Sequence, residues 1–394
     1  MRYNKNEHSR THAAGAALKP FTPASLDQVR SHLQCIDYKV TPLFSLPELA
    51  AERGVGAIFV KDESQRSTLK SFKALGGAHA VVRVVLQEAS KGLGRTVEPD
   101  EILTPEVQKV AASLTITCAT DGNHGRSVAA AAKVVGCRSV IYVHAGVSES
   151  RAAAIAALGA EVERVAGSYD DSVAYASEAA SQNQWIVVSD TSWPGYEEIP
   201  TWVMQGYLVM ADEVVQQVET SGRSLTHVFL QAGVGGFAAA LAAYFTSVYG
   251  DLAPQIIVVE PEKAACIYES AVKGEATKID HGEATVMAML ECYEPSMVAW
   301  RILQETATAF VTISDEEALY AMAALARDQS SDPVIEGGES GAASLGGLLV
   351  ALEDPEIKQS LRLNKDSVAL VINTEGATDP ELYAQLLAQA KALP

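Results

Sequence analysis

The chain has 394 residues, 48% of them hydrophobic and 20% charged, so it can bury a large core and is not a disordered protein. Its formal net charge of −19 argues against nucleic acid or an anionic membrane as a partner, because both bind basic surfaces. No apolar run reaches the roughly 18 residues of a membrane span, and the polar N-terminal stretch does not resemble a signal peptide, which predicts a cytoplasmic protein.

The first part of the chain leads to a lysine at the start of a predicted helix. Helices are expected over 25–34 and 46–53, and a strand over 57–60 precedes a polar loop. A helical pattern then covers 74–85, so Lys73 lies at a helix N-terminus. The helix dipole and the apolar neighbours there disfavour the ammonium form, which favours a nucleophile able to form a Schiff base with a carbonyl cofactor. A solvated surface lysine is the alternative.

A regular alternation of strands and helices begins after an irregular stretch at 88–107. It comprises strands over 114–118, 139–143, 161–165 and 185–188, and helices over 126–135, 149–158 and 169–182. Such alternation is typical of parallel βαβ units. We therefore expect a small α/β domain over 85–195 and a large α/β domain formed by 1–84 and 196–394.

The second half of the chain continues the alternation at longer spacing. A long helix is expected over 196–217, followed by strands over 227–230, 255–259, 310–313 and 367–372 and helices over 238–244 and 315–328. Residues 261–300 show no clear period. The loops at the strand ends are the most informative, because ligands of open α/β sheets gather at the carboxyl ends of strands.

One such loop joins the strand at 114–118 to the following helix. It reads Thr120-Asp121-Gly122-Asn123-His124-Gly125. Its glycines let the backbone approach a ligand, and amides at a helix N-terminus suit a carboxylate. The Asn123 side chain can donate a hydrogen bond to a phenolic oxygen. A turn selected only for its tolerance of positive φ is the alternative.

A second loop, Gly233-Val234-Gly235-Gly236, lies between a strand and an alanine-rich helix. Its backbone N–H groups can surround a phosphate. The stretch from Gly233 to Ala238 also fits the dinucleotide pattern G-x-G-x-x-A, and Glu260 ends the next strand, where a ribose-binding acid would be expected. A close-packed turn without a ligand is a third interpretation.

Thr374 follows the last predicted strand. Its neutral hydroxyl is suited to face the nitrogen of an aromatic ring. A helix N-cap or a turn residue is the alternative.

These four features, in this order along the chain, resemble the fold-type II pyridoxal-phosphate family, which includes threonine and serine dehydratases. The resemblance spans about residues 40–380. It implies an α/β protein with two open parallel-sheet domains and pyridoxal 5′-phosphate in the cleft between them. It also implies a homodimer that acts on a small amino acid.

Three stretches are similar to the branch of this family that releases ammonia from 2,3-diaminopropionate. They are residues 190–207, 259–266 and 374–380. Asp121 agrees with that branch, since threonine dehydratases usually carry a small residue there, whereas residues 290–293 follow it only loosely. The resemblance implies α,β-elimination of both D- and L-diaminopropionate to pyruvate and two molecules of ammonia.

The resemblance also implies a role for each candidate residue. Lys73 holds the cofactor's aldehyde, Asn123 contacts its 3′-oxygen, Thr374 faces its ring nitrogen, and the amides of Gly233, Val234, Gly235 and Gly236 bind its phosphate. The substrate carboxylate lies on the loop that contains Thr120, Asp121, Gly122 and His124. Lys73 and Asp121 take the Cα proton on opposite faces, and Asp190 meets the β-amine or caps a helix.

Two other functions would use some of the same residues. A dehydratase of a 3-hydroxy amino acid, such as threo-3-hydroxyaspartate, serine or threonine, would share every cofactor residue. A NAD(P)-dependent oxidoreductase would instead use the Gly233 loop and Glu260.

The five cysteines show no spacing typical of a metal site, so no metal is expected. Cys266 and Cys292 lie on either side of the irregular segment. Two free thiols are the default for a cytoplasmic protein, and a disulfide between them is the alternative.

Overall fold

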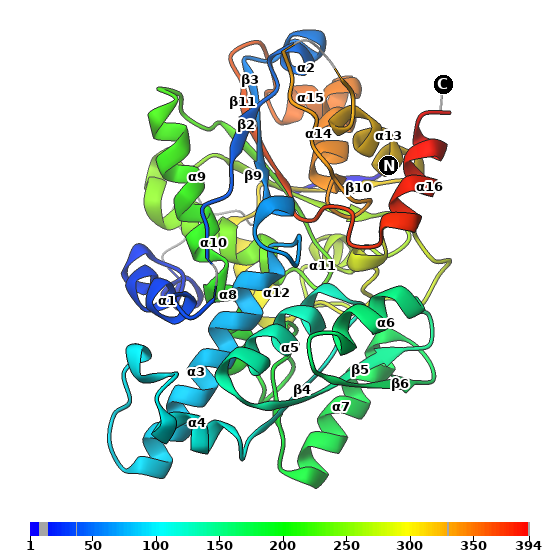
Figure 1. Cartoon of the computed structure of the whole chain (residues 1–394). Helices are drawn as coiled ribbons and strands as arrows, with labels where there is room; N and C mark the ends of the chain where they lie inside the picture. The colour runs from blue at the N-terminus through cyan, green and yellow to red at the C-terminus, as the bar shows by residue number, and fades with distance from the viewer. Residues whose placement is uncertain (8–14, 37, 329–330, 393–394) are drawn as a thin grey trace. The chain divides into compact units, whose positions relative to one another are not determined.

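The computed structural model describes residues 1–7, 15–36, 38–328 and 331–392 (Figure 1). The chain divides into two compact units. The first unit comprises Met1–Pro23, Val40–Phe72 and Met210–Pro394, and the second comprises Ala24–Lys39 and Lys73–Val209. Across the described residues, no helix combines the length and the apolar character that crossing a membrane requires.

The first unit is built on a seven-stranded sheet with the order β1-β10-β9-β8-β11-β3-β2. Its strands are β1 (Tyr3–Lys5), β2 (Leu43–Ser45), β3 (Ala57–Asp62), β8 (His227–Gln231), β9 (Gln255–Pro261), β10 (Ala309–Ile313) and β11 (Val368–Asn373). The five central strands are parallel, and the edge strands β1 and β2 run antiparallel to their neighbours. The central strands are almost entirely buried, as expected for a parallel sheet covered on both faces.

The helices of the first unit complete its core. They are α2 (Pro47–Arg53), α10 (Gly236–Tyr249), α11 (Cys266–Lys273), α12 (Met297–Thr306), α13 (Asp315–Leu325), α14 (Ala343–Glu353), α15 (Pro355–Ser360) and α16 (Pro380–Ala390), while α9 (Leu208–Thr220) continues from one unit into the other. The residues of α10 and α14 are mostly apolar on every side of the helix, and both helices are buried over most of their length. The glycine loop before α10 therefore leads into one of the most buried elements of the unit.

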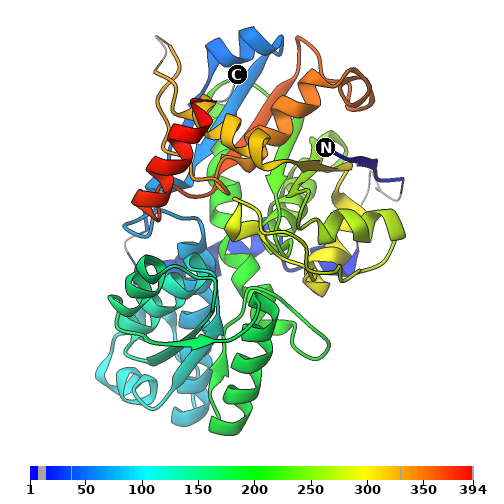
Figure 2. The ribbon, with the colours of Figure 1, turned by 90° about the vertical axis from the view of Figure 1, so that its right-hand side faces the viewer.

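The second unit contains a four-stranded parallel sheet with the order β6-β5-β4-β7. Its strands are β4 (Thr115–Ala119), β5 (Arg138–His144), β6 (Glu161–Val165) and β7 (Ile186–Val187). The chain steps outward from β4 to β6 and then returns to pair β7 with β4. Because such crossovers are right-handed, α7 (Tyr169–Asn183) covers the opposite face from α5 (Asn123–Val135) and α6 (Glu149–Ala156) (Figure 2).

Glycines let α3 pack closely against two helices of the second unit. The other helices of this unit are α1 (Leu26–Leu33), α3 (Lys73–Leu93), α4 (Pro105–Ala111) and α8 (Glu198–Gly206). A Cβ on Gly77 of α3 would lie 2.3 Å from Ser127 Oγ of α5, and a Cβ on Gly206 of α8 would lie 2.6 Å from the carbonyl oxygen of Leu75. The helix that begins with Lys73 is therefore tightly packed in this unit.

Most predicted strands and helices are present, and Lys73 begins a helix as expected. Three predictions are wrong. The helix continues to Leu93 through a segment expected to be a loop, because Ala89 is buried there. Residues 196–217, expected to form one helix, contain two helices that are separated at Tyr207. Residues 261–300, which show no clear period in the sequence, contain α11 and α12.

Two features of the chain's organisation differ from the sequence-based description. The edge strands β1 and β2 were not expected, since each has only three residues and one neighbour. The predicted domain boundary at residue 85 falls inside α3, and α3 belongs as a whole to the second unit.

Candidate active site

Lys73 forms an ion pair with Asp190 inside the second unit. Its Nζ donates to Asp190 Oδ2, and Lys73 keeps 21% of its side chain exposed while Asp190 is buried. Burial by itself would raise the pKa of Asp190, but the Lys73 ammonium and the nearby His124 hold that pKa well below its usual range. Asp190 is therefore a carboxylate at neutral pH. It is not a helix N-cap, because the next helix begins only at Glu198.

Two more side chains approach Asp190. Tyr169 Oη donates to Oδ1 at 3.3 Å, and His124 Nδ1 lies 3.9 Å from Oδ2. His124 Nε2 is 2.7 Å from the carbonyl oxygen of Val188, which only accepts, so this nitrogen carries the proton.

The remaining ring nitrogen of His124 is an open acceptor. Burial lowers the pKa of His124, against the opposing effect of Asp190, so the ring is neutral and Nδ1 carries a lone pair. Within the described part of the chain, this buried atom has no hydrogen-bond partner. It can therefore accept a hydrogen bond from an N–H or O–H group of a ligand.

The loop before α5 is closed around Thr120. Thr120 Oγ1 accepts hydrogen bonds from the amides of Gly122 and Gly125, each at 3.0 Å. Gly122 has φ of 150°, and a Cβ on Gly125 would lie 2.4 Å from Thr120 Cγ2. The fold therefore requires both glycines. Two amides that the sequence suggested for a carboxylate are occupied by Thr120, and the buried Asn123 begins α5.

Asp121 lies beside a histidine that sequence reasoning missed. The register of β4 and β5 pairs Ala119 with Tyr142, and two residues further on His144 Nε2 lies 2.9 Å from Asp121 Oδ1. Neighbouring parallel strands bring their carboxyl ends to the same edge of the sheet. The polar residue at the end of the adjacent strand was the signal that could have identified His144.

In the first unit, the glycine loop fits an anion. Gly235 is the N-cap of α10 with φ of 94°, and no side chain caps that helix. A Cβ on Gly233 would lie 2.9 Å from Cys292 Sγ, and Ser296 N donates to the carbonyl oxygen of Val234 at 2.9 Å. The loop is thus held in place by its neighbours, and α10 offers uncapped backbone amides of the kind that bind phosphate.

The two cysteines near this loop, Cys266 and Cys292, are not joined in a disulfide. Cys266 Sγ lies 3.8 Å from the carbonyl oxygen of Gly233, and Cys292 approaches the same glycine. Both side chains are buried. They pack against the loop as apolar groups.

Glu260 does not serve as a free ribose-binding acid. Its carboxylate accepts hydrogen bonds from the amides of Ile267 and Tyr268, at 2.8 Å and 2.6 Å, and so binds the N-terminal turn of α11. Burial raises the pKa of Glu260 to about 8, although these two amide bonds lower it. The geometry therefore removes the support for a dinucleotide site at the Gly233 loop.

Thr374 is buried and follows β11. Gln231, the last residue of β8, donates from Nε2 to Thr374 Oγ1 at 2.9 Å. Because the hydroxyl oxygen already accepts this bond, its proton can be given to an acceptor such as a ring nitrogen. Thr374 is not a helix N-cap, since Asp379 caps the next helix. Gln231 was missed by sequence reasoning, although it ends a strand just before the glycine loop.

The residues just before Lys73 are hydrogen-bonded to the segment that contains Thr374. Phe72 N donates to the carbonyl oxygen of Thr374 at 3.0 Å, and Gly376 N donates to the carbonyl oxygen of Lys70 at 3.1 Å. The ring of Phe72 lies 4.6 Å from that of Phe237 on α10. The backbone that leads into Lys73 is therefore fixed by the same two segments that provide the hydroxyl and the uncapped helix.

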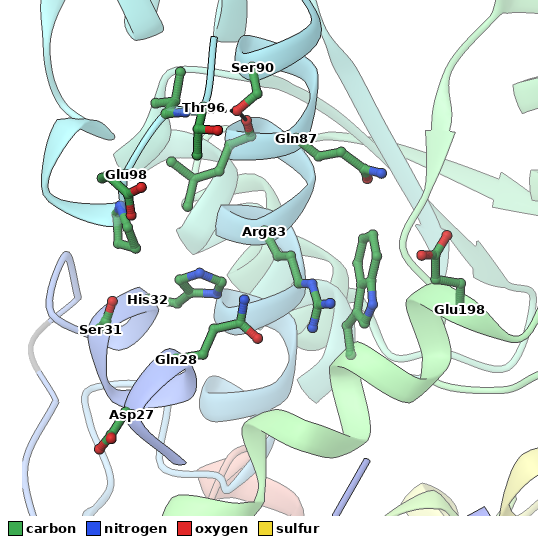
Figure 3. A pocket seen from close by; sticks show the side chains of 14 residues that line it. Asp27, Gln28, Ser31, His32, Arg83, Gln87, Ser90, Thr96, Glu98 and Glu198 are labelled. Atoms are coloured by element: carbon green, nitrogen blue, oxygen red, sulfur yellow. Dashed lines mark hydrogen bonds between the residues drawn. The ribbon is translucent and has the colours of Figure 1, made fainter. Parts of the chain in front are cut away.

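The second unit also has a cavity of about 560 Å³ (Figure 3). Its wall includes His32, Arg83, Glu198 and Trp202. The Arg83 guanidinium lies 4.5 Å from the centre of the Trp202 ring. Burial, and to a smaller extent the charge of Arg83, lowers the pKa of His32 to about 4, so this histidine is neutral. The cavity contains none of the candidate residues.

Each of the two units contains groups that suit a part of pyridoxal phosphate. Lys73 supplies an amine, α10 supplies uncapped amides for a phosphate, and Thr374 supplies a hydroxyl whose oxygen is already oriented by Gln231. His124 Nδ1 remains a buried acceptor for a ligand. Among the residues that the structure describes, no group of three or more His, Cys, Asp or Glu side chains is arranged to hold a metal ion.

Comparison with known proteins agrees with this fit. The family profile described as "Pyridoxal-phosphate dependent enzyme" matches residues 36–375. Diaminopropionate ammonia-lyase of Escherichia coli K12 is 42% identical over 365 residues, which cover 91% of this chain and 90% of that protein.

Two crystal structures of the Escherichia coli enzyme are also similar. The complex with an aminoacrylate-PLP azomethine reaction intermediate has a TM-score of 0.88 at 39% identity, and the complex with D-serine has a TM-score of 0.87 at 37% identity. Each comparison covers 99% of this chain and 97% of the other. The chain therefore belongs to the family of pyridoxal-phosphate-dependent enzymes.

Proposed function

We propose that this protein is a pyridoxal-phosphate-dependent ammonia-lyase that converts both D- and L-2,3-diaminopropionate to pyruvate and two molecules of ammonia. The observation that carries the proposal is the Lys73–Asp190 pair, which keeps an amine and a carboxylate together at the start of α3. The 42% identity to a diaminopropionate ammonia-lyase over most of both chains supports the choice of substrate.

Four groups of this chain would hold the cofactor. Lys73 attaches its aldehyde, Asn123 contacts its 3′-oxygen, and the amides of the loop from Gly233 through Val234 and Gly235 to Gly236 bind its phosphate. Thr374 donates to its ring nitrogen, with Gln231 orienting the hydroxyl. When bound, the cofactor supplies an electron-withdrawing ring that stabilises negative charge at the substrate Cα. A hydroxyl does not keep a ring nitrogen protonated as a carboxylate would, which favours prompt elimination.

Two bases explain the use of both enantiomers. Lys73 Nζ takes the Cα proton of the L-isomer, and Asp121 takes that of the D-isomer from the other face. A relative's complex with D-serine supports access of a D-amino acid to a site of this kind.

The remaining loop and Asp190 bind the substrate. Thr120, Gly122 and His124 shape the loop that receives the carboxylate. Asp190 is a carboxylate at neutral pH, so it can bind the β-ammonium group, and a protonated amine leaves more readily as ammonia than a neutral one.

A variant at the second base tests this assignment. In Asp121→Asn, pyruvate release from the D-isomer should fall at least tenfold more than release from the L-isomer, because general-base catalysis contributes about 10²-fold or more. Equal losses on both isomers would contradict the role of Asp121 as the second base.

A substrate panel tests the reaction itself. Purified enzyme is assayed for keto-acid release from both isomers of diaminopropionate and from serine, threonine and threo-3-hydroxyaspartate. We expect kcat/KM to be highest for diaminopropionate. A higher value for any of the hydroxy amino acids would make the protein a dehydratase instead.

The wider setting belongs to the same proposal. We infer that the enzyme has a large and a small α/β domain and that it is a cytoplasmic homodimer. The family resemblance supports the dimer. None of the five cysteines, all of which the structure describes, forms a disulfide, which is consistent with a reducing compartment. Light scattering of the protein as it elutes from a size-exclusion column would test the dimer. Cell fractionation would test the compartment.

A further inference from the structure

The contact between His144 and Asp121 joins the ends of two neighbouring strands. His144 is the last residue of β5, and its Nε2 lies 2.9 Å from Asp121 Oδ1. The side chains are 23% and 14% exposed, so the contact is only partly screened by water. Asp121 Oδ1 is buried and has no aligned hydrogen bond among the described residues, so the contact is electrostatic in this conformation.

The backbone next to His144 decides which ring nitrogen carries the proton. Gly146 N donates to His144 Nδ1 at 3.1 Å, so Nδ1 must present its lone pair. In the neutral ring the proton is then on Nε2, the atom that faces Asp121. A Cβ on Gly146 would lie 2.9 Å from His144 Cε1, so a glycine is needed for this arrangement.

The turn that carries His144 is held by a charged residue of β6. Arg164 Nη1 donates to the carbonyl oxygen of Val147 at 2.7 Å and to that of His144 at 3.3 Å, and Arg164 Nη2 pairs with Glu149 at 2.6 Å. Val147 N donates in turn to the carbonyl oxygen of His144 at 3.2 Å. The imidazole is therefore presented to Asp121 by a fixed turn. The charged groups of this turn and its neighbours include Asp121, Arg164 and Glu149.

We propose that His144 is a positioning residue for Asp121 and thereby sets how fast the D-isomer is turned over relative to the L-isomer. This inference rests on the proposed function, in which Asp121 is the base for the D-isomer. The Nε2–H group holds the carboxylate at one orientation and stabilises its negative charge. Lys73 is held by Asp190 instead, so loss of His144 leaves the base for the L-isomer in place.

Substitutions that remove or keep the donor test the proposal. In His144→Leu, kcat for D-diaminopropionate should fall about tenfold, as expected for the loss of a close polar contact to a charged group, while kcat for the L-isomer changes less than about twofold. His144→Gln keeps an amide nitrogen at about the place of Nε2 and should recover the D-isomer rate to within about threefold of wild type.

A control variant lies at the other end of the same strand. Arg138→Leu removes a half-exposed side chain that pairs with Glu161, and it should leave the ratio of D- to L-isomer rates unchanged. An unchanged ratio in His144→Leu, or equal losses on both isomers, would overturn the proposal. The proposal would also be overturned if His144→Gln did not recover the rate for the D-isomer.

A measurement without turnover makes the test independent of the proposed function. The imidazole signals of ¹³C-labelled histidine are followed by NMR as the pH is varied, in wild type and in Asp121→Asn, with His144→Gln identifying the signal. Because a neighbouring carboxylate stabilises the imidazolium, His144 should titrate at lower pH in Asp121→Asn. Identical titration in both proteins would show that the contact does not exist and would overturn the proposal.

The two hypotheses fail in different ways. If the wild-type enzyme releases no pyruvate from either isomer, the proposed function is contradicted, and the NMR titration still decides whether His144 and Asp121 interact. If both isomers are turned over and the D/L ratio does not depend on His144, only the present inference is contradicted.

Discussion

At the scale of single residues, the pairing of Lys73 with Asp190 determines the charge of both groups before any ligand binds. A buried carboxylate costs desolvation energy, and the ammonium offsets that cost. Tyr169 adds a hydrogen bond to the other oxygen. The amine is thus held where the chain enters α3, and a carboxylate remains beside it.

Replacing Lys73 tests whether it holds the cofactor. Lys73→Ala should abolish both the visible absorption of the cofactor-loaded protein and pyruvate release, because no other amine is assigned to the aldehyde. Lys91→Ala, near the other end of the same helix and largely exposed, is the control and should retain both. A coloured, fully active Lys73→Ala enzyme would contradict the assignment.

Replacing Asp190 tests the ion pair in the cofactor-free protein. The pKa of Asp190 is depressed in the folded state, so its stabilising effect is complete above the unfolded pKa near 3.9 and is lost as the pH falls below it. Asp190→Asn should lower the free energy of unfolding by about 2 kcal/mol at pH 7, less than for a fully buried pair because Lys73 is partly exposed.

The difference between wild type and Asp190→Asn should shrink below about pH 4. Urea unfolding at pH 7 and at pH 3 measures it. Glu161→Gln, which breaks an exposed pair with Arg138, should change stability little at either pH. A pH-independent difference for Asp190→Asn would mean that the ion pair is not its cause.

At the scale of secondary-structure elements, glycines determine how closely α3 approaches its neighbours. Gly206 of α8 faces the carbonyl oxygen of Leu75, whereas a methyl group added to Gly92, near the end of α3, would have no neighbouring atom closer than 3.8 Å. A methyl group on Gly206 would have to displace backbone, and a methyl group on Gly92 would not. The same substitution should therefore act in opposite directions at the two sites.

Alanine at each position provides the comparison. Gly206→Ala should lower the free energy of unfolding by about 2 kcal/mol through overpacking, although alanine favours helices. Gly92→Ala should raise it by about 0.5–1 kcal/mol, because alanine is the better helix former. Chemical unfolding of both variants measures the two changes. Stabilisation by Gly206→Ala would show that α3 and α8 are not closely packed.

The elements themselves were largely predictable, and the contacts between them were not. Alternating apolar strands and amphipathic helices identified β4 to β6 and their helices, because each carries its own period. The edge strands β1 and β2 carry too little pattern. Asp121 and Lys73 could be chosen from local motifs. Asp190 was identified only as a possible substrate contact or helix cap, and His144 was not identified at all. Their pairing with Lys73 and Asp121 depends on the tertiary fold, since strand order decides which residues share a sheet edge.

At the scale of the whole molecule, each compact unit combines segments that are distant in the sequence. In the first unit, buried charges join two of these segments, Val40–Phe72 and Met210–Pro394. Glu213 accepts hydrogen bonds from Lys61 at 2.6 Å and from Arg66 at 2.8 Å, and Thr41 and Glu63 complete the network. This network fixes the loop that leads from β3 to Lys73.

Removing one charge of this network should destabilise the first unit. Glu213→Gln leaves two buried cations with a single carboxylate, so the free energy of unfolding should fall by about 3 kcal/mol or more. Glu219→Gln changes an exposed residue of the same helix and should have little effect. A stable Glu213→Gln protein would mean that the cations rearrange to reach water.

The central claim is that both amino groups of either enantiomer are released as ammonia, the β-amino group by elimination and the α-amino group by hydrolysis of the resulting aminoacrylate. The most direct test is the stoichiometry of ammonia and pyruvate released by the cofactor-loaded enzyme from D- and from L-diaminopropionate, with the visible spectrum recorded in the same cuvette. The proposed reaction predicts two ammonia per pyruvate with both isomers and a change in the cofactor's absorption on mixing. Release of no pyruvate from either isomer, or of one ammonia per pyruvate, would contradict it.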